Sequence, residues 1–196
     1  MINLIKRGFR FLIFLLYRFK FGYFGIQSSI HSPLRITGAK NIYIGKCVSI
    51  HYKVWLAARN HTGNVPTLKI GDRSTIGDFA HIFATKSIII ENDVLLANFV
   101  YIADNLHGYE NPVLPIIKQP IVQKGEVNIG EGSWLGEHVC VIGASIGKHC
   151  VIGANSVVTH SIPDYCVAVG VPARIIKRFD FDSREWKKTQ PNGDFI

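Results

Sequence analysis

The sequence predicts an all-β solenoid, a parallel β-helix in which repeated coils wind around one apolar core. Aliphatic residues recur at every sixth position, and the series is Ile70, Ile76, Ile82, Ile88, Val94, Val100 and Leu106. A period of six is not that of a helix, but it is a multiple of the two-residue alternation of a strand. Three such steps would close one coil of about 18 residues. Charged residues make up only 18% of the chain, which argues against disorder.

A second observation is that the steps share the same corner chemistry. Glycine often follows the aliphatic residue, at Gly45, Gly71, Gly77, Gly130, Gly136, Gly147 and Gly153. A small residue often stands four positions after it, as at Ser74, Ala80, Ser133, Ser145, Cys150 and Ser156. The chain must turn at each step, and glycine and small side chains fit such turns. A polar stretch at 59–66 reads as a loop between coils.

The two ends differ in composition from the coils. Residues 1–30 form a basic and aromatic segment, in which a helix is expected over 4–21. Its apolar run at 11–17 is too short to span a bilayer and has no small-residue cleavage site after it. This helix rests on an anionic membrane, caps the open end of the solenoid or packs on a partner subunit. Residues 179–196 are expected to form a C-terminal helical cap and tail, with the helix starting near Asp182 or Ser183.

The net charge of +8 suits an anionic partner: nucleic acid, a membrane surface or a phosphorylated small molecule. Composition alone does not distinguish among these three kinds of partner. The four cysteines, Cys47, Cys140, Cys150 and Cys166, show no metal-binding spacing. They are interpreted as reduced, mostly structural thiols of a cytosolic protein.

Three segments carry a resemblance to a known family. Residues 70–75 (IGDRST), 76–81 (IGDFAH) and 152–157 (IGANSV) resemble the hexapeptide repeat of left-handed parallel β-helix acyltransferases. The resemblance covers roughly residues 36–178 and implies a β-helix domain over 31–178. The left hand comes from the resemblance alone, since the general preference for right-handed crossovers points the other way.

The six-residue series of aliphatic residues stops at His107. An excursion at 108–126 follows, which contains Pro112, Pro115 and Pro120. Regular coils then resume at 127–130, and Trp134 follows in the next step. This arrangement looks like the active-site region of galactoside- and maltose-type O-acetyltransferases, and is closer to the branch that acetylates bacterial surface polysaccharides.

The resemblance implies that His107 is the general base, which takes the proton of a sugar hydroxyl as the oxygen attacks a thioester. No covalent acyl-enzyme is then required. Asp104 and Asn105 are candidates to orient the imidazole or contact the substrate, and Trp134 is a candidate to shape the site. The asparagine that contacts the acceptor in the galactoside branch has no counterpart near Gly77 and Asp78, so the acceptor identity does not carry over.

The stretch from Val151 to Arg174 resembles the terminal coil of the family and implies acetyl-CoA as the acetyl donor, with no metal expected. Six residues are candidates for cofactor binding: Gly136, Ala154, Thr159, His160, Arg174 and Lys177. Ala154 would pass close to the pantetheine arm, and Arg174 and Lys177 would meet the phosphates. Family members often have lysine where His160 stands.

The resemblance therefore implies an acetyl-CoA-dependent O-acetyltransferase of a saccharide hydroxyl, in lipopolysaccharide O-antigen, capsule or exopolysaccharide biosynthesis. It further implies a homotrimer in the cytoplasm, with peripheral contact at the inner face of the cytoplasmic membrane as an open question, and no nucleic-acid partner. A free small-molecule acceptor and a non-catalytic scaffold remain alternatives. A γ-type carbonic anhydrase is disfavoured, because His81 and His107 lack the closely spaced histidine pair of its zinc site.

Overall fold

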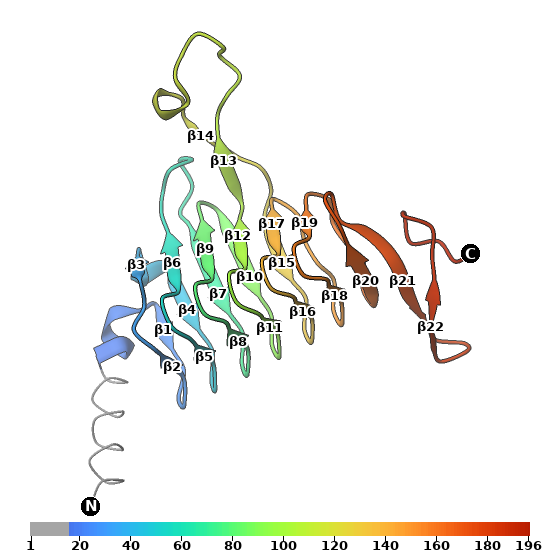
Figure 1. The fold of residues 1–196 in the computed structure, drawn as a ribbon. Coiled ribbons are helices and arrows are strands. Elements are labelled where there is room, and N and C mark those ends of the chain that lie inside the picture. The colour runs from blue at the N-terminus through green and yellow to red at the C-terminus, as the bar shows by residue number, and fades with distance from the viewer. Residues whose placement is uncertain (1–15) are drawn as a thin grey trace, which may run out of the picture.

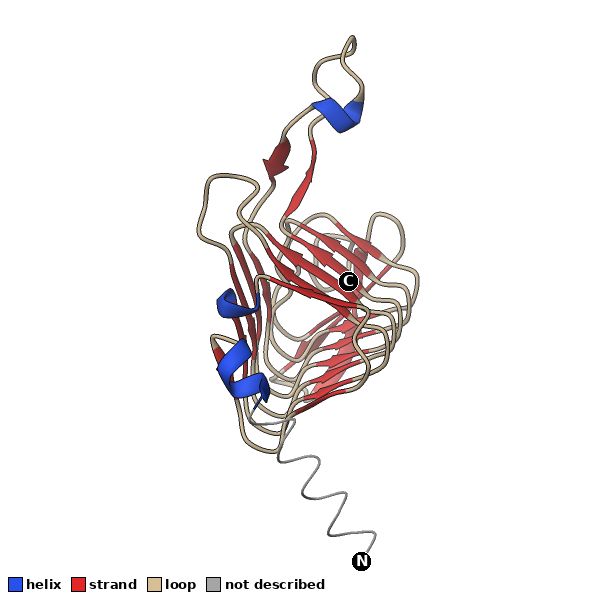
Figure 2. Ribbon diagram, turned by 90° about the vertical axis from the view of Figure 1, so that its left-hand side faces the viewer, coloured by secondary structure: helices blue, strands red, loops and turns tan. Residues whose placement is uncertain are grey.

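The computed structural model describes residues 16–196, which form a parallel β-helix of three sheets with a hairpin projecting from one edge (Figures 1 and 2). The five-stranded sheet contains β1 (Tyr23–Phe24), β4 (Ile42–Ile44), β7 (Thr67–Ile70), β10 (Ser87–Ile90) and β15 (Val127–Ile129). The six-stranded sheet contains β3 (Arg35–Thr37), β6 (Trp55–Ala58), β9 (His81–Ala84), β12 (Tyr101–Ala103), β17 (Cys140–Ile142) and β19 (Val157–Val158).

The nine-stranded sheet is the longest of the three. Its strands are β2 (Ser29–Ile30), β5 (Ser49–Ile50), β8 (Thr75–Ile76), β11 (Leu95–Leu96), β16 (Trp134–Leu135), β18 (Val151–Ile152), β20 (Cys166–Val169), β21 (Arg174–Asp180) and β22 (Glu185–Lys188). The separate two-stranded sheet consists of β13 (Asn105–His107) and β14 (Ile121–Gln123). The described residues also contain two short 3-10 turns, η1 (Ala39–Asn41) and η2 (Ile116–Lys118).

Register-matched side chains stack into three buried columns, one from each sheet. The columns are Ile44, Ile70, Ile90 and Ile129; Ile50, Ile76, Leu96, Leu135, Ile152 and Ala168; and Leu56, Ile82, Ile102, Val141 and Val158. Each coil buries its apolar residue only against the coils beside it, which confirms the solenoid prediction.

The coil length differs from the expected 18 residues. Ile70 pairs with Ile90 and Ile76 with Leu96, so this coil spans 20 residues, from 70 to 90 and from 76 to 96. Ile70, Ile76 and Ile82 follow one another at the expected six-residue spacing. The extra residues of the coil therefore lie in the corner between β9 and β10. After that corner the six-residue series runs out of register with the column.

The later members of that series therefore occupy other positions. Val94 and Val100 are buried just before β11 and β12, while Leu106 has left the core and lies half-buried in β13. Residues with the same six-residue spacing in the sequence therefore occupy different positions in the structure.

The N-terminal end of the β-helix is closed by aromatic rings. Residues 16–20 are helical, and the rest of the helix expected over 4–21 lies outside the described residues apart from Phe21, which follows the helix. The Tyr17 ring lies 5.6 Å from that of Phe21 and 5.3 Å from that of Phe24, measured between centroids. These contacts favour the capping interpretation for residues 17–24. Because β1 and β2 already belong to the sheets, the β-helix begins before the expected boundary at residue 31.

Over residues 16–196, no helix is long and apolar enough to cross a membrane.

The expected C-terminal helix over 179–189 is wrong, because β21 and β22 form an antiparallel hairpin there (Figure 1). The carboxylate of Asp180 accepts bonds from the Asp182 N–H and the Ser183 hydroxyl, and it pairs with the Lys187 ammonium. The same Asp and Ser pattern that resembles a helix start therefore builds a turn. The C-terminal end is capped by strands.

Candidate active site

A two-stranded hairpin leaves the β-helix at the edge between the six-stranded and five-stranded sheets (Figures 1 and 2). In it, His107 of β13 pairs with Ile121 of β14. The Gly108 N–H then donates to the Pro120 carbonyl oxygen over 2.8 Å, which closes the pairing directly beyond the histidine. The excursion expected at 108–126 is therefore the outer part of a paired hairpin, and not a plain loop.

The His107 side chain is exposed at the end of β13. Within residues 16–196 its ring makes no hydrogen bond and no ion pair. Nothing in the described chain therefore competes for its nitrogens, so the ring is available to accept a proton from a bound hydroxyl. The pairing of β13 with β14 places the residue that carries it.

The tip of the hairpin folds on itself around Gln119. The Gln119 amide nitrogen donates to the carbonyl oxygens of Asn111 and Leu114, both over 2.9 Å, and its oxygen accepts the Asn111 N–H over 3.1 Å. These bonds hold η2 in place. They also leave the apolar side chains of Val113 and Ile117 projecting into solvent.

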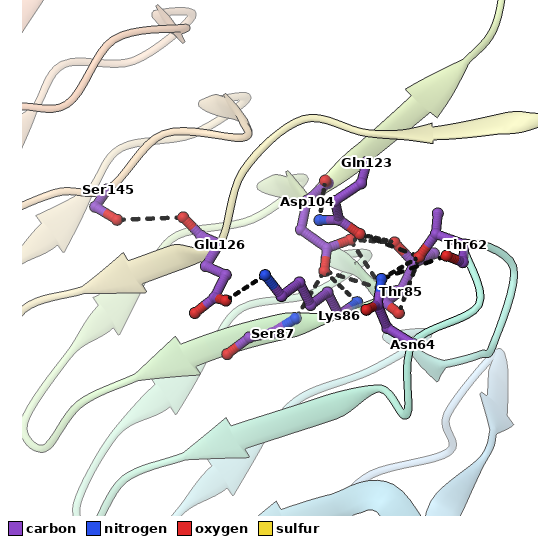
Figure 3. A network of polar contacts seen from close by, with 9 residues as sticks. All are labelled: Thr62, Asn64, Thr85, Lys86, Ser87, Asp104, Gln123, Glu126 and Ser145. Carbon is purple, nitrogen blue, oxygen red and sulfur yellow. Dashed lines mark hydrogen bonds and ion pairs between the residues drawn. The ribbon is translucent and has the colours of Figure 1, made fainter.

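The root of the hairpin is fixed by Asp104, a carboxylate with no exposed surface (Figure 3). It accepts the backbone N–H groups of Thr85, Lys86 and Ser87 over 2.7 to 3.0 Å. It also accepts the Thr85 hydroxyl and the Asn105 amide. Three successive N–H groups satisfy this buried carboxylate, which forms no ion pair within residues 16–196.

The expectation that Asp104 and Asn105 orient the imidazole or contact the substrate directly is not met. Asp104 is fully enclosed, and Asn105 is only 7% exposed and donates to the Phe83 carbonyl oxygen and to Asp104. Both side chains point back into the coil beneath. The Asp104 carboxylate accepts the otherwise unpaired N–H groups of the 85–87 corner, and the Asn105 amide donates to the Phe83 carbonyl oxygen and to Asp104. Neither bonds to His107.

Gly136 and Ala154 are brought together at the edge between the nine-stranded and six-stranded sheets. A Cβ atom at position 136 would lie 2.8 Å from the Ala154 nitrogen, so only glycine fits this approach. Ala154 is exposed there. Trp134 lies nearby along the chain, on the outer face of the nine-stranded sheet between Leu95 and Val151, and is 48% exposed.

The other four cofactor candidates lie toward the C-terminal end. Thr159 and His160 follow β19 on the same edge as the hairpin, and the Thr159 hydroxyl lies 3.1 Å from His160 Nδ1. Arg174 begins β21, and Lys177 stands opposite Lys188 across the β21–β22 pair. In the described chain, neither Arg174 nor Lys177 forms an ion pair.

One chain does not bring all of these residues into one site. His107 is on a hairpin at one edge, whereas Gly136 and Ala154 are at another edge. Across residues 16–196, no hydrogen bond, ion pair or ring contact joins His107 to Trp134 or to Arg174.

Three of the four cysteine thiols, those of Cys140, Cys150 and Cys166, lack the features of a nucleophile. Burial raises the pKa of Cys150 to about 11 and also raises the pKa values of Cys140 and Cys166. Raised pKa values favour the unreactive thiol form, which supports the structural interpretation. Among the described residues there is no group of three His, Cys, Asp or Glu side chains that could hold a metal ion.

Sequence reasoning missed the partners of the hairpin root, Gln123, Thr85 and Thr62. Gln123 bonds to Thr85, 38 residues away, and to Thr62, 61 residues away. No local spacing connects such positions. Lys188 was also missed, because its strand was expected to be a helix.

The sequence of the chain is similar to those of known acetyltransferases. A family model for the hexapeptide repeat of succinyl-transferase matches residues 126–160. The Escherichia coli protein WbbJ, named as a lipopolysaccharide biosynthesis O-acetyl transferase, is 38% identical over 125 residues, which are 60% of this chain and 63% of WbbJ. A Mycobacterium tuberculosis protein named as an acetyltransferase is 37% identical over 149 residues, which are 69% of this chain and 49% of that protein. These matches give a hexapeptide repeat at residues 126–160 and a similarity to acetyltransferases over more than half of the chain.

Two solved structures share this fold. The maltose O-acetyltransferase of Clostridium difficile has a TM-score of 0.54 at 26% identity, over 84% of this chain and 73% of that one. The N-acyltransferase AntD of Bacillus cereus, in complex with dTDP and 3-hydroxybutyryl-CoA, has a TM-score of 0.70 at 21% identity, over 86% and 88%. The fold is thus the expected left-handed β-helix. The chain spans about half to two thirds of the length of the two curated relatives.

Proposed function

We propose that this protein is an acetyl-CoA-dependent O-acetyltransferase that acts on a saccharide hydroxyl, with His107 as the general base. The observation that carries the proposal is the exposed His107 imidazole, which has no side-chain partner within residues 16–196 and lies on a hairpin that leads into the hexapeptide repeat at 126–160. The name of WbbJ supports a surface polysaccharide as the acceptor, namely lipopolysaccharide O-antigen, capsule or exopolysaccharide.

The reaction balances without a covalent enzyme intermediate. The neutral imidazole of His107 takes the hydroxyl proton while the sugar oxygen attacks the thioester carbonyl of acetyl-CoA. The carbon–sulfur bond then breaks, and the imidazolium returns the proton to the departing thiolate. The products are an O-acetyl ester and free CoA. The Gly108 N–H donates to Pro120, so it does not serve as the oxyanion donor.

The cofactor is proposed to lie along the C-terminal coils. The close approach of Gly136 to Ala154 keeps that edge free of bulky side chains, which suits a pantetheine arm. Arg174 and Lys177 offer positive charge to the phosphates, and Lys188 adds a third cation beside Lys177. Like charges opposite each other are unfavourable unless an anion lies between them.

A homotrimer completes the proposed site, with the hairpin of one copy facing the cofactor coils of the next. The separation of His107 from Gly136 and Ala154 within one chain supports this arrangement, as does the family resemblance. A dimer or monomer with full activity, measured by light scattering on the active fraction, would contradict it.

The proposed location is the cytoplasm, with contact at the inner face of the cytoplasmic membrane through residues 4–21 and a lipid-linked acceptor. Exposed Leu16 and Phe19 next to Arg18 and Lys20 support the membrane contact. Deleting residues 1–15 keeps Tyr17 and Phe21 in the cap, so the shortened protein should fold but bind anionic vesicles less. Unchanged binding would refute the contact for residues 4–15.

The test of the activity is thiol release from acetyl-CoA with a panel of acceptors. The panel should include surface-polysaccharide repeat units, free sugars, amino sugars and a xenobiotic hydroxyl compound. Turnover with the repeat units supports the proposal. Preference for a free small molecule would replace the acceptor, and no turnover with any acceptor would favour a non-catalytic scaffold.

A further inference from the structure

The root of the His107 hairpin is held by a polar network that joins three separate segments of the chain (Figure 3). The segments are the corner at 85–87, the loop at 59–66 and the hairpin itself. Gln123, the last residue of β14, is the side chain that touches all of them.

Each polar atom of the Gln123 amide is used. Its nitrogen donates to the Asp104 carbonyl oxygen over 2.7 Å. Its oxygen lies 2.9 Å from the Thr85 hydroxyl and 3.2 Å from the Thr62 hydroxyl, and both hydroxyls are placed to donate to it. Thr85 shares its proton between this oxygen and the Asp104 carboxylate.

The segments that Gln123 joins are themselves fixed. Asp104 is held by the three N–H groups of the 85–87 corner, and its carbonyl oxygen also accepts the Lys124 N–H over 2.9 Å. In the loop, the Asn64 amide donates to the Thr62 hydroxyl over 3.0 Å. Gln123 therefore ties the returning arm of the hairpin to a rigid coil on one side and to a folded loop on the other.

The network acts on His107 through the hairpin backbone. Gln123 pairs with Asn105, and Ile121 pairs with His107, so the imidazole lies two residues farther along the arm. That distance is about 7 Å at the rise of a β-strand. Because the ring has no side-chain partner among the described residues, a tilt of the arm at its root moves the ring directly.

We propose that Gln123 is a positioning residue, which sets the angle of the hairpin and hence the place of the His107 imidazole by coupling the hairpin to the loop at 59–66. This inference rests on the proposed role of His107 as the base. A displacement of about 1 Å in a reacting group can lower a rate by about a hundredfold.

The first test is Gln123→Ala in the full-length protein, with thiol release measured at saturating acceptor. We expect kcat to fall by about 10- to 100-fold. The KM for acetyl-CoA and the stoichiometry of CoA binding should stay unchanged, because the bonds of Gln123 go to Asp104, Thr85 and Thr62, and none of these is a cofactor candidate. An unfolded fraction would instead lower the binding stoichiometry.

The matched control is Gln119→Ala, which changes a buried glutamine at the tip of the same hairpin. Its bonds lie within the tip, to Asn111 and Leu114, and do not reach the coil. We expect its kcat to change by less than about threefold, since its loss leaves the root intact. An equal fall in both variants would overturn the proposal, because any loosening of the hairpin would then suffice.

The second test is a double-mutant cycle with Thr62→Val, which removes one hydroxyl from a half-buried loop position. Thr62→Val alone should lower kcat by about threefold or more, and in the Gln123→Ala background it should have almost no further effect. Independent, multiplying effects would refute the coupling to the loop. If Gln123→Ala does not fold, an unchanged kcat in Thr62→Val refutes the proposal by itself.

These outcomes separate this inference from the proposed function. Full activity in His107→Ala would refute the role of His107 as the general base, and Gln123 would then have no catalytic group to position. An inactive His107→Ala together with a fully active Gln123→Ala would keep the base and refute the positioning role.

Discussion

Ile76 and the root of the hairpin lie in the same and the next coil, yet they are stabilised by different interactions. Ile76 is stacked between Ile50 and Leu96 with no exposed surface, and its contacts are apolar. Asp104 is equally enclosed, but its contacts are hydrogen bonds to N–H groups and side chains. The apolar columns define the fold, whereas the polar root determines where a functional side chain points.

That difference has a physical basis. Apolar burial is nondirectional, so any aliphatic residue of suitable size extends a column. Hydrogen bonds need particular distances and angles, so the network around Asp104 permits one orientation of the hairpin. Stability and activity should therefore respond differently to changes in the two regions.

The largest effect on stability is expected from Ile76→Ala. The substitution leaves a cavity in the column and should lower the free energy of unfolding by about 2 to 5 kcal/mol. The kcat for acetyl transfer should change little below the unfolding range, because Ile76 is not at the hairpin root. Urea unfolding and thiol release measure the two quantities, and a large fall in kcat would show that the regions are not separate.

A smaller loss of stability, but a larger loss of activity, is expected from Asp104→Asn. The amide cannot accept all the N–H groups of the 85–87 corner, and an unsatisfied buried group costs about 1 to 3 kcal/mol. The hairpin root should loosen and kcat should fall.

Asp72→Asn is the matched control for that substitution. The Asp72 carboxylate also caps a corner, by accepting the Lys46 N–H over 2.8 Å, but it is only half-buried and lies away from the hairpin. It should leave kcat unchanged. Equal effects in the two variants would contradict the special role of the root.

The sequence predicted the columns well, because their signal is local. The glycines and the aliphatic residues around Ile76 and Ile152 identify coils without any knowledge of distant contacts. The same signal failed at Val94 and Val100, which keep the six-residue spacing although the coil has lengthened to 20 residues, from 70 to 90.

The candidate site could be predicted only in part. The break in the pattern located His107, whereas the bonds from Gln123 to Thr62 and Thr85 depend on the closure of two coils. At the C-terminal end, Asp180 and Ser183 make a turn whose first bonds resemble a helix cap. Only the pairing with the following strand distinguishes the two.

The smallest expected effect concerns the cofactor. Lys177→Ala should weaken CoA binding by a few fold and dephospho-CoA binding by less, because an exposed charge contact contributes little in water. The difference between the losses of CoA and dephospho-CoA affinity should be smaller at high salt. Lys69→Ala, on the outer face of the five-stranded sheet, is the control. Calorimetry that shows equal losses for the two ligands would place the terminal phosphate elsewhere.

The central claim is that His107 performs the proton transfer. Its most direct test is the rate of acetyl transfer by His107→Ala, compared with His31→Ala, which changes an exposed histidine of the first coil. The account predicts that His107→Ala loses at least about a hundredfold in kcat, in the range for general base catalysis, while CoA affinity is retained. His31→Ala should match the wild type. Wild-type turnover in His107→Ala would contradict the account.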